Sequence, residues 1–137
     1  MNFSANQLAI AAYVFVFGED GLITEDEADA LVREMFNSPD FYRDAVDFQL
    51  AMDFFTEDYN VVMGLFQKKE NAWKQFQGPL QALPLDEKCS IVQLVVDAAR
   101  SEEVLEDATG EWDALKELMG GLQITFSDLD DWKQRKR

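Results

Sequence analysis

The chain has no histidine, and its 137 residues include a single cysteine, Cys89. These absences exclude zinc sites built from cysteine and histidine, iron–sulfur clusters held by cysteines, and intramolecular disulfides. They also remove histidine as a general acid or base, and they leave Cys89 without the partner that activates a nucleophilic thiol. We therefore expect a protein that is not an enzyme, in which Cys89 is a thiol of the core or its boundary.

Long apolar runs are also missing. The longest, Leu8 to Phe17, has ten residues, whereas a helix needs about 20 to span a bilayer. No Lys or Arg precedes this run and no cleavage pattern follows it, so it does not resemble a secretory signal. We expect a buried helix here, no transmembrane segment and a cytoplasmic location.

Basic residues are scarce, with 12 Lys and Arg against 27 Asp and Glu, for a net charge of -15. A field of this sign repels nucleic-acid phosphates and anionic membranes, and it attracts cations or basic protein surfaces. We therefore expect no direct binding of nucleic acid and a protein partner with a basic surface.

What the chain does have is a content of 47% hydrophobic residues with only three prolines and seven glycines, which is typical of a folded globule. Apolar residues recur at helical spacing, which predicts an all-α fold, a compact bundle of about seven helices in a single domain over residues 1–137. The prolines in Gly78-Pro79 and Leu83-Pro84 predict a connection between two halves, about 1–77 and 84–137.

Helix-capping residues precede most of the apolar stripes. Each is a Ser, Thr or Asp whose side chain can accept a hydrogen bond from the first turn. The starts predicted in this way are at Ser4, Thr24, Ser38-Pro39, Thr56, Asp86 and Thr125.

The plan of the first two helices returns in the second half. Asp20-Gly21-Leu22-Ile23 and Glu102-Glu103-Val104-Leu105 are both acidic turns that end in two aliphatic residues, and both lie between an apolar helix and a second helix. The alignment needs two extra residues in the second copy. It predicts a weak internal helix-turn-helix pseudo-repeat.

The first acidic turn has two interpretations. Thr24 and Glu27 have the spacing of a capping box, which makes Glu27 part of a helix start. Asp20 and Glu27 are also candidate side-chain ligands for weakly bound Ca²⁺ or Mg²⁺. The pseudo-repeat adds possible ligands from the second turn, which are Glu102, Glu106 and Asp107.

An EF-hand does not explain the turn. If Gly21 is the invariant glycine of the loop, its first and third positions fall on Val16 and Gly18. Neither residue offers a side-chain oxygen, so a tight calcium site is not expected.

An all-α chain with an Asp-Gly-x-Ile-x-x-x-Glu turn, and a weaker copy about eighty residues later, resembles the TerB-like tellurite-resistance family. The resemblance implies a non-catalytic domain of about seven helices that binds cations through acidic residues and acts as an adaptor or sensor in stress-response assemblies. Asp20 and Glu27 match the first motif. In the second motif Glu102 replaces aspartate, Glu103 replaces glycine and Thr109 replaces glutamate, so this chain is similar to a divergent member.

Two functions follow. The first is a non-catalytic adaptor or sensor domain that binds a divalent cation weakly. The alternative is an acidic protein-interaction module without metal, which includes a nucleic-acid mimic, and which engages a basic partner. Its face would carry six acidic residues, Asp40, Asp44, Asp47, Asp53, Glu57 and Asp58.

Overall fold

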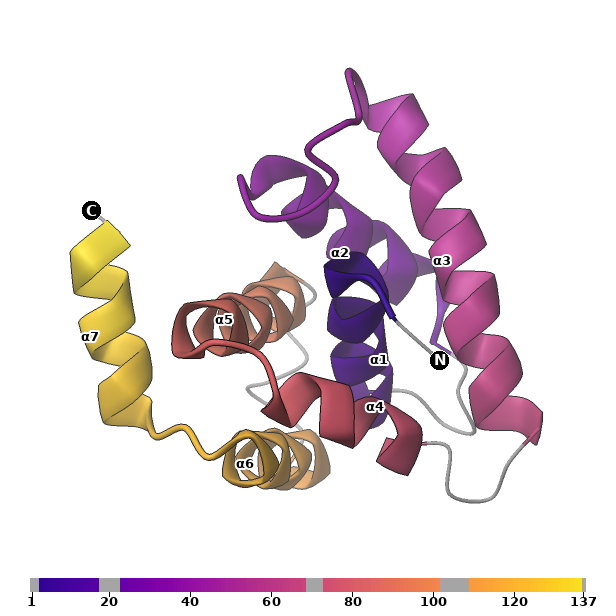
Figure 1. Cartoon of the computed structure of the whole chain (residues 1–137). Coiled ribbons are helices and arrows are strands. Elements are labelled where there is room, and N and C mark those ends of the chain that lie inside the picture. Colours follow the sequence, from indigo (N-terminus) through magenta and orange to yellow (C-terminus); the bar gives the residue numbers. More distant parts are fainter. Residues whose placement is uncertain (1–2, 18–22, 69–72, 102–108, 137) are drawn as a thin grey trace.

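The computed structural model describes residues 3–17, 23–68, 73–101 and 109–136. The described residues form seven helices and no strand, which confirms the all-α prediction (Figure 1). In chain order these are α1 (Ala5–Phe17), α2 (Glu25–Asn37), α3 (Phe48–Lys68), α4 (Trp73–Gln81), α5 (Leu85–Ser101), α6 (Thr109–Leu122) and α7 (Phe126–Lys136).

Helix α1 lies at the centre of the bundle. Every residue from Leu8 to Val14 is buried, as is Val16, because the helix is apolar on all sides and packs against α3, α4, α5 and α6. Figure 1 shows it surrounded by these later helices. One cluster of buried side chains draws on all seven helices, so the expectation of a central buried helix is confirmed.

The other contacts follow a reciprocal pattern between the two halves. Helix α2 packs against α5, and its counterpart α6 packs against α1. Helix α3 packs against α1, while α7 packs against α5. The α2–α5 and α1–α6 contacts thus correspond under the alignment of the two acidic turns, which pairs α1 with α5 and α2 with α6, whereas α2 also packs against α3.

Three of the predicted helix starts are confirmed by reciprocal side-chain bonds. The backbone amide of Gln7 donates to Ser4 Oγ at 3.1 Å, and that of Asp128 donates to Thr125 Oγ1 at 3.1 Å. In each case the side chain three residues on accepts from the cap amide in return. The third box, at Thr24, belongs to the acidic turn and is described with it below.

The predicted helix start at Ser38-Pro39 is wrong. Residues 38–47 form turns, and α3 begins only at Phe48. The side chain of Asp47 accepts a 2.9 Å hydrogen bond from the Leu50 amide, so Asp47 is the residue that caps the helix. Tyr42 adopts a left-handed φ of 47°, which a continuous helix excludes.

The predicted start at Thr56 is wrong too, because α3 runs unbroken through it. Thr56 Oγ1 donates to the Met52 carbonyl oxygen at 2.9 Å, so its hydroxyl is satisfied inside the helix. Gly78-Pro79 does not end a helix either, because Pro79 lies within α4. Leu83-Pro84 does separate α4 from α5, but Asp86 lies inside the first turn of α5 and is not its cap.

Candidate functional site

Of the five predicted metal ligands, the structure describes only Glu27. Its Oε1 accepts a 2.8 Å hydrogen bond from the Thr24 amide, and its own amide donates to Thr24 Oγ1 at 3.1 Å. This is the predicted capping box at the start of α2. Asp20, Glu102, Glu106 and Asp107 lie outside the described residues.

No other metal cluster replaces them in the part of the chain that is described. Within it, no three Cys, Asp or Glu side chains are grouped so that they could hold an ion. The contacts seen for Glu27 are therefore those of a helix cap.

The six acidic residues of the predicted interaction face do not act alike. Asp58 accepts hydrogen bonds from Gln7 Nε2 at 3.2 Å and from the Tyr42 hydroxyl at 3.0 Å. Asp47 caps α3, and Asp53 Oδ1 accepts from Gln49 Nε2 at 3.2 Å. Asp47, Asp53 and Asp58 therefore each have a structural partner along α3 or across the fold, and Asp44 and Glu57 lie exposed on the surface.

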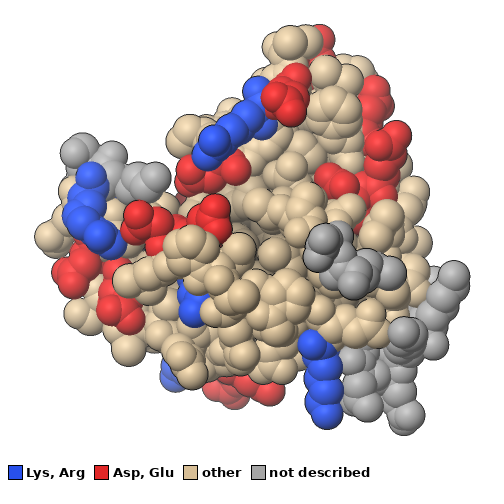
Figure 2. Space-filling view, viewed as in Figure 1, with Lys and Arg blue, Asp and Glu red and all other residues tan. Residues whose placement is uncertain are grey.

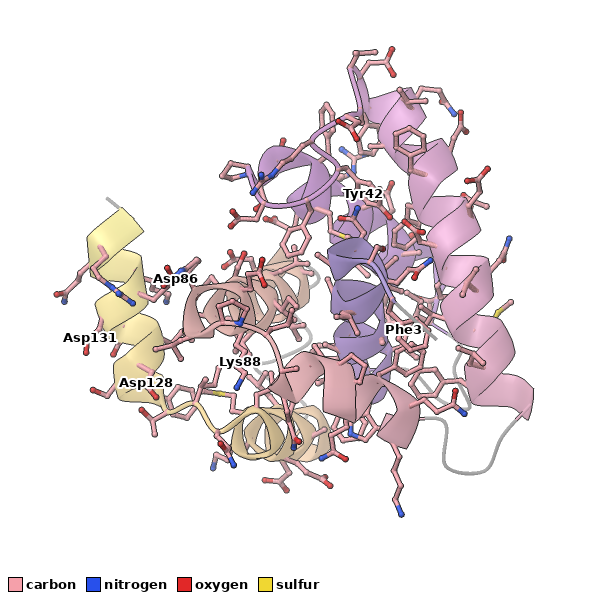
Figure 3. All side chains as sticks on the ribbon, viewed as in Figure 1. Phe3, Tyr42, Asp86, Lys88, Asp128 and Asp131 are labelled. Atoms are coloured by element: carbon pink, nitrogen blue, oxygen red, sulfur yellow. The ribbon has the colours of Figure 1, made fainter. Side chains whose placement is uncertain are left out.

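Tyr42 shows how tightly the segment before α3 is attached to the bundle. Its amide donates to Asn6 Oδ1 at 3.3 Å, and its hydroxyl reaches Asp58 on α3. Figure 3 shows Tyr42 between the N-terminal start of α1 and α3. Burial, and then the adjacent negative charge and hydrogen bond of Asp58, raise the pKa of the Tyr42 hydroxyl well above its usual range.

The sixth acidic residue, Asp40, lies in a different place. Its Oδ2 accepts a 2.7 Å hydrogen bond from Ser90 Oγ, and its Oδ1 lies 3.7 Å from Arg43 Nη2. Ser90 is a buried polar residue on α5. This bond joins the segment after α2 to α5 and holds the Asp40 carboxylate between two hollows in the surface.

The larger hollow is a groove of about 350 Å³ between α2, the segment that follows it, α5 and α7. Three carboxylates line it, and three apolar residues contribute to its wall. The acidic residues are Glu34, Asp40 and Asp97, and the apolar residues are Pro39, Leu94 and Trp132. No Lys or Arg is among the described residues that line it. We call it the acidic groove.

Hydrogen bonds hold two carboxylates of the acidic groove in place. Asp97 Oδ1 accepts from Gln93 Nε2 at 2.7 Å, one turn away on α5, and Asp40 is fixed by Ser90. Gln93 Oε1 is buried and has no hydrogen-bond partner among the described residues. Two of the three groove carboxylates are therefore held by side-chain hydrogen bonds.

The smaller hollow, of about 80 Å³, lies on the other side of Asp40 and is lined by Arg43 and Glu87 among others. A third, open hollow lies where α5 meets α7, and Asp128, Asp131 and Arg135 line it. Figure 3 shows Asp128 and Asp131 on α7 and Asp86 beside them on α5, and Asp86 Oδ1 lies 3.4 Å from Arg135 Nη2. An arginine lines each of these two hollows, whereas no Lys or Arg is among the described residues that line the acidic groove.

Sequence reasoning missed most of the acidic groove. Asp40 was among the predicted acidic residues, but Glu34, Asp97 and Trp132 were not singled out as site residues. The groove residues come from three helices that are far apart in the chain, and no local spacing links them. Cys89 is buried, as expected, and burial raises the pKa of its thiol, which disfavours the reactive thiolate.

Among the described helices, none combines the length and apolarity that crossing a membrane requires. No protein-family model, curated protein or solved structure matches the chain. The resemblance to the TerB-like family consequently stays a prediction that rests on the two short motifs.

Proposed function

We propose that the chain is a non-catalytic helical adaptor domain that binds a basic protein partner. The observation that carries this proposal is the acidic groove, which three carboxylates from α2, α5 and the segment after α2 line together with no Lys or Arg among the described lining residues. A surface of this kind selects partners of opposite charge and speeds their association.

The charge of the whole chain supports the same function. Acidic residues outnumber basic ones by 15, so complete pairing within the chain would still leave 15 carboxylates without a basic partner. On the face seen in Figure 2, acidic side chains gather along α3 and around α5 and α7, with basic side chains scattered between them. A basic partner relieves the repulsion among these charges.

An adaptor role agrees with the TerB-like resemblance, and a cytoplasmic location is part of the same proposal. Binding of Ca²⁺ or Mg²⁺ and a role in stress response or tellurite resistance remain predictions from that resemblance. The basic partner includes nucleic-acid-binding proteins, for which the acidic surface would mimic a phosphate backbone.

Affinity capture with matched variants tests this function. The immobilised wild type is incubated with host lysate at low salt, and bound proteins are eluted with about 0.5 M salt, at which exposed charges are screened within a few ångströms. The groove variant carries Glu34→Gln and Asp97→Asn, and the control carries Glu57→Gln and Asp53→Asn, which remove the same charge from α3.

We expect basic proteins in the salt eluate, captured about tenfold less by the groove variant and almost unchanged by the control. Competition by DNA identifies a nucleic-acid-binding partner. Capture that resists high salt, or equal losses in the two variants, would contradict binding through the acidic groove.

A further inference from the structure

Helix α7 is attached to the rest of the bundle by little buried surface. It packs mainly against α5, and Figure 1 shows it at the edge of the molecule. Among residues 126–135, Leu129 and Trp132 are buried and the others are at least partly exposed. In α1, by contrast, every residue from Leu8 to Val14 is buried. Because buried apolar surface is the main source of stability, α7 is held less firmly than the central helix.

The polar contacts between α5 and α7 add little to this attachment. Arg135 Nη2 lies 3.4 Å from Asp86 Oδ1, but both side chains are mostly exposed, so water and salt screen their attraction. The Cys89 thiol donates to the Asp128 carbonyl oxygen at 4.0 Å, and a thiol is a weak donor. The capping box at Thr125 joins two residues of the α7 start itself, so its bonds persist when the helix moves.

The end of α6 is held independently of α7. The backbone amides of Gln123 and Ile124 donate back to carbonyl oxygens of α6, each at 3.1 Å, which satisfies the last turn of that helix. Lys88 Nζ on α5 donates to the Leu122 carbonyl oxygen at 3.1 Å. Residues 123–125 are therefore a short connection between a helix that is fixed to α5 and a helix that is weakly held.

We infer that α7 is a releasable cover of α5, which opens as one unit about residues 123–125 while α1 to α6 stay folded. Its few buried side chains make this opening less costly than unfolding of the whole chain. The connection begins at Gln123, whose left-handed φ of 60° turns the chain sharply between the two helices. Rotation about these three residues separates α7 from α5 without disturbing the bonds that end α6.

Opening uncovers the side of α5 that faces α7. Cys89 lies on this side and is fully buried when α7 is in place. Trp132 leaves with α7, and because it lines the acidic groove, opening also removes part of the groove wall. A partner that binds the groove with this wall in place therefore favours the closed form. This effect on the groove rests on the proposed function, whereas the opening itself does not.

The rate at which Cys89 is alkylated measures the opening, because Cys89 is the only cysteine of the chain. The probe is N-ethylmaleimide, which is uncharged, so the acidic surface does not repel it. Labelling of the full chain is followed by mass spectrometry and compared with labelling of a peptide of residues 86–92. Urea denaturation gives the equilibrium constant for global unfolding. We expect labelling at least about a hundredfold slower than in the peptide, yet at least about tenfold faster than global unfolding permits.

The urea dependence of the labelling rate tests whether the opening is local. This dependence scales with the surface that is exposed, and α7 contributes 11 of the 137 residues. Well below the midpoint of unfolding, we expect a slope less than about a third of that for global unfolding. Hydrogen exchange provides a second measurement, in which the backbone amides of Leu129 and Trp132 should open with the same equilibrium constant as Cys89.

Two variants with the same substitution separate local from global opening. Leu129→Ala removes a buried side chain from α7, and Leu31→Ala removes one from α2. We expect labelling of Cys89 to become about thirtyfold faster or more in Leu129→Ala, because the packing that holds α7 closed is lost. In Leu31→Ala it should change by less than about threefold. Circular dichroism verifies folding, and the milder Val32→Ala replaces Leu31→Ala if that variant does not fold.

Four results would each overturn the releasable cover. They are labelling of wild-type Cys89 at the rate that global unfolding permits, labelling as fast as in the peptide, a urea slope equal to that of global unfolding, and equal acceleration in the α7 and α2 variants. No partner is present in these measurements, so their failure leaves the proposed function untouched. Loss of selective capture by the acidic groove, in turn, would leave the opening of α7 standing.

Discussion

The start of α2 and the junction around Asp58 use carboxylates in opposite ways. At Thr24 and Glu27 the two hydrogen bonds join residues three apart, and both bonds are exposed. At the junction, Asp58 joins Gln7 of α1 to Tyr42, at separations of 51 and 16 residues. The comparison teaches that the same chemical group stabilises a helix start in one place and joins distant segments in another, with unequal consequences for stability.

The largest expected effect comes from breaking the junction. Asp58→Ala removes the acceptor of two side-chain hydrogen bonds and leaves the partly buried donors of Gln7 and Tyr42 unsatisfied. We expect a loss of about 2–3 kcal/mol in the free energy of unfolding, measured by urea denaturation. The adjacent, exposed Glu57→Ala should change it by less than about 0.5 kcal/mol. Similar values for both variants would show that the junction does not stabilise the fold.

Measuring the stability of Tyr42→Phe over a range of pH tests the contribution of the Tyr42 hydroxyl to the junction. At pH 8 we expect the variant to be about 1 kcal/mol less stable, because it lacks the hydrogen bond to Asp58. Burial and Asp58 raise the pKa of Tyr42 in the native state, so above the ordinary tyrosine pKa of about 10 the unfolded chain loses a proton that the native chain keeps. Wild-type stability must then fall with rising pH.

The fall in the free energy of unfolding of the wild type can be measured against the Tyr42→Phe variant. Since the phenylalanine side chain of the variant has no proton to lose, the wild-type advantage of about 1 kcal/mol should fall by about 1.4 kcal/mol between pH 8 and pH 11, which leaves the variant slightly more stable at pH 11. Urea denaturation of both proteins across this range measures it. An advantage that stays constant up to pH 11 would mean that the Tyr42 hydroxyl ionises equally in both states.

The smallest effects are expected at the capping box. Thr24→Ala removes one reciprocal bond and should cost about 1 kcal/mol. Glu27→Gln should cost only a few tenths, because glutamine fits the same box. Thermal denaturation with and without about 5 mM Ca²⁺ separates cap from ligand. A calcium-dependent stabilisation that disappears in both Glu27→Gln and Asp20→Asn would contradict a purely structural Glu27.

Structure that depends on bonds within one helical turn could be predicted from the sequence, and structure that depends on bonds between distant segments could not. The boxes at Ser4, Thr24 and Thr125 were identified correctly because both partners of each bond lie within one helical turn. The start at Ser38 was not, because Tyr42 is held by Asn6 and Asp58, and Asp47 competes as the cap. Apolar spacing near Phe41 and Ala45 resembles a helix whether or not the backbone can form one.

The same contrast between local and distant residues applies to the candidate site. Glu27 could be singled out because an acidic turn is a local pattern. The acidic groove could not, because Glu34, Asp97 and Trp132 meet only after α2, α5 and α7 pack. Each of these residues alone has an ordinary place on its own helix, and only their convergence supports the proposed binding of a partner.

The burial of α1 has a consequence for the synthesis of the chain. Its apolar surface is covered by α3, α4, α5 and α6, and α6 ends about a hundred residues after α1. At roughly 5–20 residues per second, a nascent α1 waits about 5–20 s for its last neighbour. During that interval the most hydrophobic helix of the protein is made but not yet covered, so slowing translation between α1 and α6 should increase aggregation more than slowing it afterwards.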